Sequence, residues 1–259
     1  MSQVAAASNT RAPDMRSNAR VRMDLVSNRV DFIIARCAEV IRARGQVAHL
    51  GCSDSPFTDH RLANGNLLHT HLLAIGPVVG FDIDTRALET LAHRFPEAEF
   101  IATGIGEVVP AEHRQRYKLV IAGEVLEHVS DAGQFLQGCR ALLQFDGRLL
   151  VTVPNACSPK IGVRALVGRE TVHPDHHVYY GPRTLRRALF DAGLETSYLA
   201  SYLATPGPLG RSVNLGLRAA NRFTGGPVGE GLIALATPIP GRRANSAHAA
   251  GGVAGRRAN

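Results

Sequence analysis

The stretch that decides the fold is Tyr117-Lys118-Leu119-Val120-Ile121-Ala122-Gly123-Glu124-Val125-Leu126-Glu127-His128. Its apolar run, from Leu119 to Ala122, predicts a buried strand, and the residues after it predict a turn and then a helix. In such a helix Glu124, Glu127 and His128 stand at i, i+3 and i+4 and share one face. A polar cluster directly after a buried strand is typical of an active site at the carboxyl end of a parallel sheet.

Strand and helix patterns alternate on both sides of this stretch. Strands are predicted at residues 47–50, 78–84, 99–102, 119–122, 148–153, 194–203 and 231–237. Helices are predicted at residues 30–44, 64–73, 85–95, 132–143 and 182–192. This alternation predicts an α/β fold with a doubly wound, mostly parallel sheet. We assign the domain to residues 25–240, with flexible tails at residues 1–24 and 241–259, the second of which contains arginines.

Composition and charge narrow the function classes. No apolar run approaches a membrane span, residues 1–20 do not resemble a secretory signal, and the four cysteines form no C-x-x-C pair. These features predict a cytoplasmic protein with reduced thiols and no membrane partner. The net charge is +7, but residues 25–240 carry only +1 of it. The basicity therefore lies in the tails, which disfavours nucleic acid as a partner.

A nucleotide-type cofactor site is predicted at the first two strands of the domain. Gly51 begins the turn after the first of these strands, and Asp82 ends the next one, where its carboxylate can accept hydrogen bonds from a ribose. The chain has no G-x-G-x-x-G and no Walker lysine motif. Dinucleotides and nucleoside triphosphates are therefore disfavoured as ligands.

The chain resembles the class I S-adenosylmethionine-dependent methyltransferases over about residues 28–238. Five motifs in the family's order carry the resemblance: His49-Leu50-Gly51-Cys52-Ser53-Asp54-Ser55, Val79-Gly80-Phe81-Asp82-Ile83-Asp84, Glu124-Val125-Leu126-Glu127-His128, Gly147-Arg148-Leu149-Leu150-Val151-Thr152-Val153-Pro154-Asn155, and His173-Pro174-Asp175-His176 with Tyr180-Gly181-Pro182-Arg183-Thr184-Leu185. The E-V-L-E-H and H-L-G-C-x-D-x-P forms resemble a bacterial subgroup associated with small-molecule or glycan biosynthesis. The resemblance implies a Rossmann-like sheet whose last strand is antiparallel, and S-adenosyl-L-methionine as cofactor.

The resemblance also implies the residues that would contact the cofactor, namely His49, Gly51, Cys52, Ser53, Asp54, Asp82, Ile83, Gly104, Ile105 and Gly123. Three departures from the family pattern affect this assignment. Ser53 and Ser55 replace glycines, so the turn must be looser or avoid positive φ there. His49 replaces an acid, and Gly104 replaces the acid that usually holds the adenine, which leaves Ile105 to pack on the ring. Cys52 is expected to fill space, because nothing near it in the sequence lowers its pKa.

Two interpretations of the E-x-x-E-H face compete. In one, Glu124, Glu127, His128 and the later His176 hold Mg²⁺, Mn²⁺ or a similar ion, as the family's ubiquinone-pathway and small-RNA 2′-O-methyltransferases do. The ion would bind a hydroxyl pair of the acceptor. In the other, both glutamates favour the dipole of the helix and His128 packs. Glu124, His128 and His176 are also the candidate catalytic residues, and His173 and His177 are alternatives to His176.

Three functions follow from these patterns. The favoured one is methyl transfer from S-adenosylmethionine to an oxygen or nitrogen of a small metabolite or sugar. The alternatives are an RNA 2′-O-methyltransferase and a non-catalytic binding module on the same fold. The oligomeric state is not readable from the sequence.

Overall fold

The computed structural model describes residues 23–106, 109–169, 173–203 and 210–242. Within these residues one sheet contains all the strands, which are β1 (Asp24–Val26), β2 (Val47–Leu50), β3 (Val79–Asp82), β4 (Phe100–Ala102), β5 (Tyr117–Gly123), β6 (Leu143–Pro154), β7 (Leu194–Tyr202) and β8 (Gly231–Pro238). The helices are α1 (Arg29–Arg42), α2 (Thr58–Ala63), α3 (Leu68–Leu73), α4 (Thr85–Arg94), α5 (Ala132–Leu142), α6 (Pro159–Leu166), α7 (Pro182–Asp191) and α8 (Gly210–Thr224), with short 3₁₀ turns η1 (Ala111–His113) and η2 (Leu126–His128).

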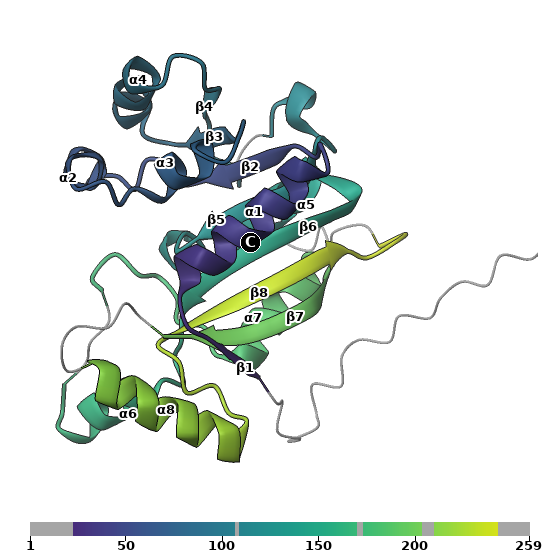
Figure 1. Cartoon of the computed structure of the whole chain (residues 1–259). Coiled ribbons are helices and arrows are strands. Elements are labelled where there is room, and N and C mark those ends of the chain that lie inside the picture. The colour runs from purple at the N-terminus through teal and green to yellow at the C-terminus, as the bar shows by residue number, and fades with distance from the viewer. Residues whose placement is uncertain (1–22, 107–108, 170–172, 204–209, 243–259) are drawn as a thin grey trace, which may run out of the picture.

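The strand order of the sheet is β1-β7-β8-β6-β5-β2-β3-β4. Neighbouring strands run parallel except around β8, which is antiparallel to both β6 and β7. Figure 1 shows α1 lying across one face of this sheet. The predicted α/β fold, with a doubly wound and mostly parallel sheet and an antiparallel last strand, is confirmed.

Two apolar clusters cover the two faces of the sheet. Alternate residues of β5 divide between them, because successive side chains of a strand point to opposite faces. Val120 and Ala122 pack with α5 and α7 in the larger cluster, whereas Leu119 and Ile121 pack with α1 and α3 in the smaller one. The polar residues that follow β5 are therefore held by a strand buried on both faces.

The described residues extend slightly beyond those assigned to the domain. Met23 is buried and Asp24 begins β1, so the described fold already includes the last two residues assigned to the N-terminal tail. At the other end, the guanidinium of Arg242 lies 3.9 Å from the ring centroid of Phe190. The rest of both predicted tails, residues 1–22 and 243–259, lies outside the described residues.

Candidate active site

The backbone turns sharply where β5 ends. Glu124 has a φ of 58°, in the left-handed region that a residue with a side chain rarely adopts. Between Glu124 and the start of α5 the chain forms the 3₁₀ turn η2 and no α-helix. The predicted helix beginning at Glu124 is therefore wrong. Its consequence, a single face shared by Glu124, Glu127 and His128, is absent as well.

Glu124 belongs to a network on the α1 side of this turn. Its Oε1 accepts hydrogen bonds from the Thr152 hydroxyl at 2.9 Å and the Tyr202 hydroxyl at 3.0 Å, and lies 3.4 Å from Nη1 of Arg29. Burial, with the Glu124 charge second, raises the pKa of Tyr202 well above its usual value, so the phenol remains a donor. Sequence reasoning missed Arg29 and Tyr202, which come from opposite ends of the chain.

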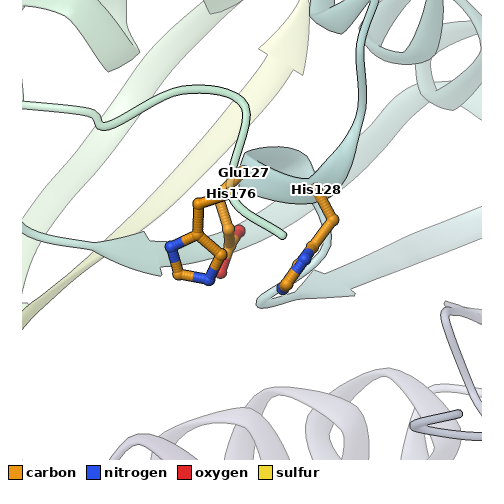
Figure 2. Close-up of side chains that lie close together, drawn as sticks. All are labelled: Glu127, His128 and His176. Atoms are coloured by element: carbon orange, nitrogen blue, oxygen red, sulfur yellow. The ribbon is translucent and has the colours of Figure 1, made fainter. Parts of the chain in front are cut away.

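Three of the four predicted metal ligands do come together. One ligand atom from each of Glu127, His128 and His176 lies within 4.8 Å of the other two, and Figure 2 shows the three side chains gathered below η2. His176 comes from the loop before α7, which docks on η2 through the backbone: the amide of His177 donates to the carbonyl of Glu127 at 2.8 Å. The Nδ1 of His128 lies 3.2 Å from the carbonyl oxygen of Asp175, which leaves its Nε2 for a ligand.

The Glu127 carboxylate has no partner among the described residues. It is 1% exposed, and neither of its oxygens accepts a hydrogen bond there. Burial and then the Glu124 charge raise its pKa to about 8. An unpaired buried carboxylate costs several kcal/mol unless a cation or a donor reaches it.

His176 is in a similar state. Its buried Nδ1 has no partner among the described residues, and burial, followed by the neighbouring His128 and His173, lowers its pKa. Its ring lies 4.6 Å from that of His128 and 5.6 Å from that of Tyr179. The imidazole is thus held in the neutral form, which is the form that binds metals.

These residues fit a divalent cation. The donor set is one carboxylate and two imidazoles, which suits Mn²⁺, Fe²⁺ or Zn²⁺ as well as Mg²⁺. The unpaired Glu127 oxygens and the unpaired His176 nitrogen are the atoms such an ion would satisfy. Glu124, the fourth predicted ligand, lies outside the cluster because Arg29, Thr152 and Tyr202 hold its carboxylate.

The turn after β2 is held to β3 by backbone hydrogen bonds. The amides of Gly51 and Cys52 both donate to the carbonyl of Phe81, at 2.8 and 3.2 Å. Positive φ occurs at Gly51 (68°) and Asp54 (53°), so the expectation that Ser53 and Ser55 avoid it is confirmed. The Cys52 side chain is buried and burial raises its pKa, in keeping with a space-filling role.

Asp82 is already engaged by this turn. Its Oδ2 accepts from the amide of Ser53 at 2.9 Å and from the Ser53 hydroxyl at 2.7 Å, and its Oδ1 accepts from the amide of Asp84 at 3.1 Å. A ribose would therefore share Asp82 with Ser53 or displace the serine hydroxyl.

The residues expected around the adenine differ in exposure. Ile83 is 77% exposed, whereas Ile105 is buried in the larger core cluster next to α5. Of these two residues, Ile83 is therefore the one whose side chain could pack on an adenine ring. Gly104 and Gly123 are both half-buried, and Gly123 lies beside Leu68 and Arg29.

His49 faces α3 rather than an open cavity. It is buried, and its Nδ1 lies 3.1 Å from Nδ1 of His69. Burial, then His69 and Arg29, lowers the pKa of His49 well below its usual value, and burial lowers that of His69 to about 4. Both imidazoles are neutral at pH 7, so His49 brings no charge to a cofactor.

A family model described as a methyltransferase domain matches residues 25–199. The chain belongs to the methyltransferase-domain family. Residues 25–199 include β2 to β5, the turn at Glu124 and the loop with His176, so the match covers the predicted site residues, whereas Tyr202 lies just beyond it.

Curated relatives match parts of this methyltransferase domain. The ubiquinone biosynthesis O-methyltransferase of Rhodopseudomonas palustris (strain HaA2) is 38% identical over 74 residues, which are 29% of this chain and 28% of that enzyme. The enzyme of the same name from Saccharophagus degradans is 29% identical over 140 residues, 50% of this chain and 58% of that enzyme. The chain thus spans about a quarter to just over half of the length of these relatives.

A solved structure shows the same fold. The magnesium protoporphyrin IX methyltransferase of Synechocystis PCC 6803, determined with bound S-adenosylhomocysteine, superposes with a TM-score of 0.50 at 15% identity, over 81% of each chain. At this identity the likeness concerns the arrangement of strands and helices, and the activity has to be argued from the site.

Proposed function

We propose that this protein transfers the methyl group of S-adenosylmethionine to an oxygen, or a nitrogen, of a small metabolite or sugar, assisted by a divalent cation. The observation that carries the proposal is the buried, unpaired carboxylate of Glu127 beside His128 and His176. The ubiquinone-pathway relatives, named as O-methyltransferases, support an oxygen acceptor.

The residues at the end of β3 would hold the donor. Asp82 would bind the ribose, sharing its oxygens with Ser53, and the exposed Ile83 would cover one side of the adenine. β2 lies between β3 and β5, and the carboxyl ends of these parallel strands meet at one edge, so this position and the turn that follows β5 share that edge, one strand apart. The donor and the cluster of Glu127, His128 and His176 would then flank one space.

On the acceptor side, Glu127, His128 and His176 would hold the ion. A bound cation supplies a Lewis acid that lowers the pKa of an acceptor hydroxyl and orients a hydroxyl pair. The lowered pKa of His176 keeps its imidazole neutral and able to coordinate, whereas the Glu127 carboxyl, with a pKa of about 8, is mostly protonated at pH 7 and would release its proton when the ion binds. The network of Arg29, Thr152 and Tyr202 would keep the Glu124 carboxylate out of the ligand set, although its charge still acts on His176.

Donor binding is tested by calorimetry with S-adenosylhomocysteine. We expect binding by the native protein and an affinity at least about tenfold lower for Asp82→Ala, because a hydrogen bond to a charged group contributes about 1.5–3 kcal/mol. Asp59→Ala, in the exposed α2, is the control and keeps the native affinity. Absence of any binding heat for the native protein would contradict the proposal.

Ion binding is tested separately, by thermal unfolding with Mg²⁺, Mn²⁺, Fe²⁺ or Zn²⁺. An ion at a hundredfold excess over its Kd stabilises the fold by about 2.7 kcal/mol. We expect this gain to disappear in Glu127→Ala and His176→Ala and to persist in His177→Ala, an exposed neighbour. Equal gains in all variants would place the ion elsewhere.

Methyl transfer to an RNA 2′-hydroxyl stays a prediction, which a salt-dependent gel shift would test.

A further inference from the structure

Two helices, α6 and α8, lie beyond the carboxyl ends of the strands, where the candidate site is. None of their described side chains is buried. α6 follows the carboxyl end of β6, and α8 lies between the carboxyl end of β7 and the start of the antiparallel β8. Topology therefore places both beyond the edge at which β5 presents Glu127, and Figure 1 shows them beyond the same end of the sheet. Short helices gain most of their stability from packing an apolar face. α6 buries no side chain, and α8 touches the domain through β1 and the Arg218–Ser27 hydrogen bond, so the exposed apolar sides of both helices have no covering layer among the described residues.

The apolar side chains of these helices face solvent. Leu166 and Phe223 are each 87% exposed, Leu215 is 70% exposed, Val167 68% and Val163 63%. These five are most of the large hydrophobic residues exposed in the described part of the chain. Such a concentration on two helices marks an interaction surface.

All charged residues within the two segments that contain α6 and α8 are positive, and the acidic Glu230 adjoins them. Residues 156–169 carry Lys160, Arg164 and Arg169, and residues 204–229 carry three further arginines, without an acidic residue in either segment. Lys160 pairs with Glu230, while Arg164, Arg169 and Arg222 are exposed. The net charge of +1 over residues 25–240 concealed this concentration, because acidic residues elsewhere in the domain offset it.

We propose that α6 and α8 dock this protein onto an anionic membrane surface. Leucine, valine and phenylalanine would enter the headgroup boundary, while the lysine and arginines pair with lipid phosphates. A second copy of the chain is disfavoured on this face, because the exposed arginines of the two copies would meet, and the adjoining Glu230 already pairs with Lys160.

Docking of this kind is peripheral. None of the helices in the described parts of the chain is long and apolar enough to cross a membrane. Because α6 and α8 extend from the edge that holds Glu127, the docked protein would present that edge to the bilayer. The expectation of no membrane partner is thereby revised to attachment at the surface.

The test is co-sedimentation of the full chain with phosphatidylcholine vesicles, with and without phosphatidylglycerol. We expect binding only to the anionic vesicles, and a partition coefficient at least about tenfold lower for Leu166→Ser with Phe223→Ser, since both side chains lose a place in the interface. Arg164→Glu with Arg222→Glu should weaken binding similarly and remove most of its salt dependence.

Matched controls separate this surface from the arginine-rich tails. Phe145→Ser removes an aromatic residue that is 78% exposed in β6, near the opposite edge of the sheet, and Arg42→Glu reverses an exposed charge in α1. Both should bind as the native protein does. If all variants bind equally, the tails alone adsorb and the proposal is overturned. The proposal is also overturned if the native protein does not bind vesicles and instead forms a dimer that Phe223→Ser abolishes. Because the assay needs neither methyl donor nor ion, its outcome is independent of the proposed activity.

Discussion

Glu124 and Glu127 are three residues apart and have opposite electrostatic surroundings. Glu124 accepts two hydrogen bonds and lies beside Arg29, so its charge is compensated. Glu127 is buried without a partner among the described residues, and its pKa rises to about 8. The two side chains have different partners, although they lie close enough for the Glu124 charge to raise the pKa of Glu127. One carboxylate thus stabilises the fold, whereas the other is held ready for a ligand.

This contrast predicts opposite stability changes for two identical substitutions. The pKa of Glu127 in the folded state lies above its unfolded value of 4.5. The stabilisation that the protonated carboxyl gives to the folded state is therefore fully present below pH 4.5 and is lost as the pH rises through about 8. The loss amounts to about 1.4 kcal/mol per pH unit. Without added metal, Glu127→Gln should therefore be more stable than the native protein at pH 8, with a flatter stability profile. Glu124→Gln should be less stable by about 1–2 kcal/mol.

Urea unfolding between pH 5 and 8 measures both changes. Glu127→Gln should also lose the stabilisation by ions. A Glu127→Gln variant that is less stable than the native protein at pH 8 would show that the carboxylate is compensated in solution without added ions.

At the scale of elements, α5 and the segment after β4 approach one another at a glycine. A Cβ on Gly138, in the middle of α5, would overlap the carbonyl oxygen of Ile105. Ile105 follows Gly104 in the segment predicted to lie near the adenine. Gly138 therefore sets how closely α5 packs against the segment that contains Ile105.

We predict that Gly138→Ala destabilises the protein by about 1–3 kcal/mol, because the helix and the Ile105 segment must separate. The sign is diagnostic, since glycine to alanine within a helix ordinarily stabilises by up to about 1 kcal/mol. Gly133→Ala, in the exposed first turn of α5, is the matched control and should follow the ordinary rule. Thermal unfolding of the two variants measures the difference, and equal shifts would contradict the close approach.

At the scale of the whole molecule, the chain before α1 closes one side of the sheet. β1 pairs with β7 in parallel through three residues, Met23 is buried, and the Met23 amide donates to the carbonyl of Gly225 after α8. The start of the domain therefore holds β7 and the segment after α8 against the rest of the sheet.

Removal of residues 1–26 should lower the free energy of unfolding by about 3 kcal/mol, because Met23 loses its burial and β7 becomes an open edge. Removal of residues 1–22 is the control, since it retains β1, and should leave the unfolding free energy within about 0.5 kcal/mol of the native value. Urea unfolding of both proteins tests this. Equal stability of the two truncated proteins would show that β1 contributes nothing.

The sequence by itself determined the sheet from β2 to β8 and most of the candidate site. Apolar runs such as Leu119–Ala122 and the acid at Asp82 are local patterns, and the carboxyl ends of parallel strands bring the residues after them to one edge. Glu127, His128 and His176 could be predicted as a group in this way.

Features that rest on contacts between residues distant in sequence could be seen only in the tertiary structure. Arg29, Thr152 and Tyr202 take Glu124 out of the metal cluster. α6 and α8 form in segments for which the sequence predicted neither a strand nor a helix, and their apolar faces remain open. Local periodicity predicts which residues are buried in a strand or helix. The direction of a side chain after a sharp turn, and the partner of an exposed helix, depend on energies supplied by residues far away in the chain.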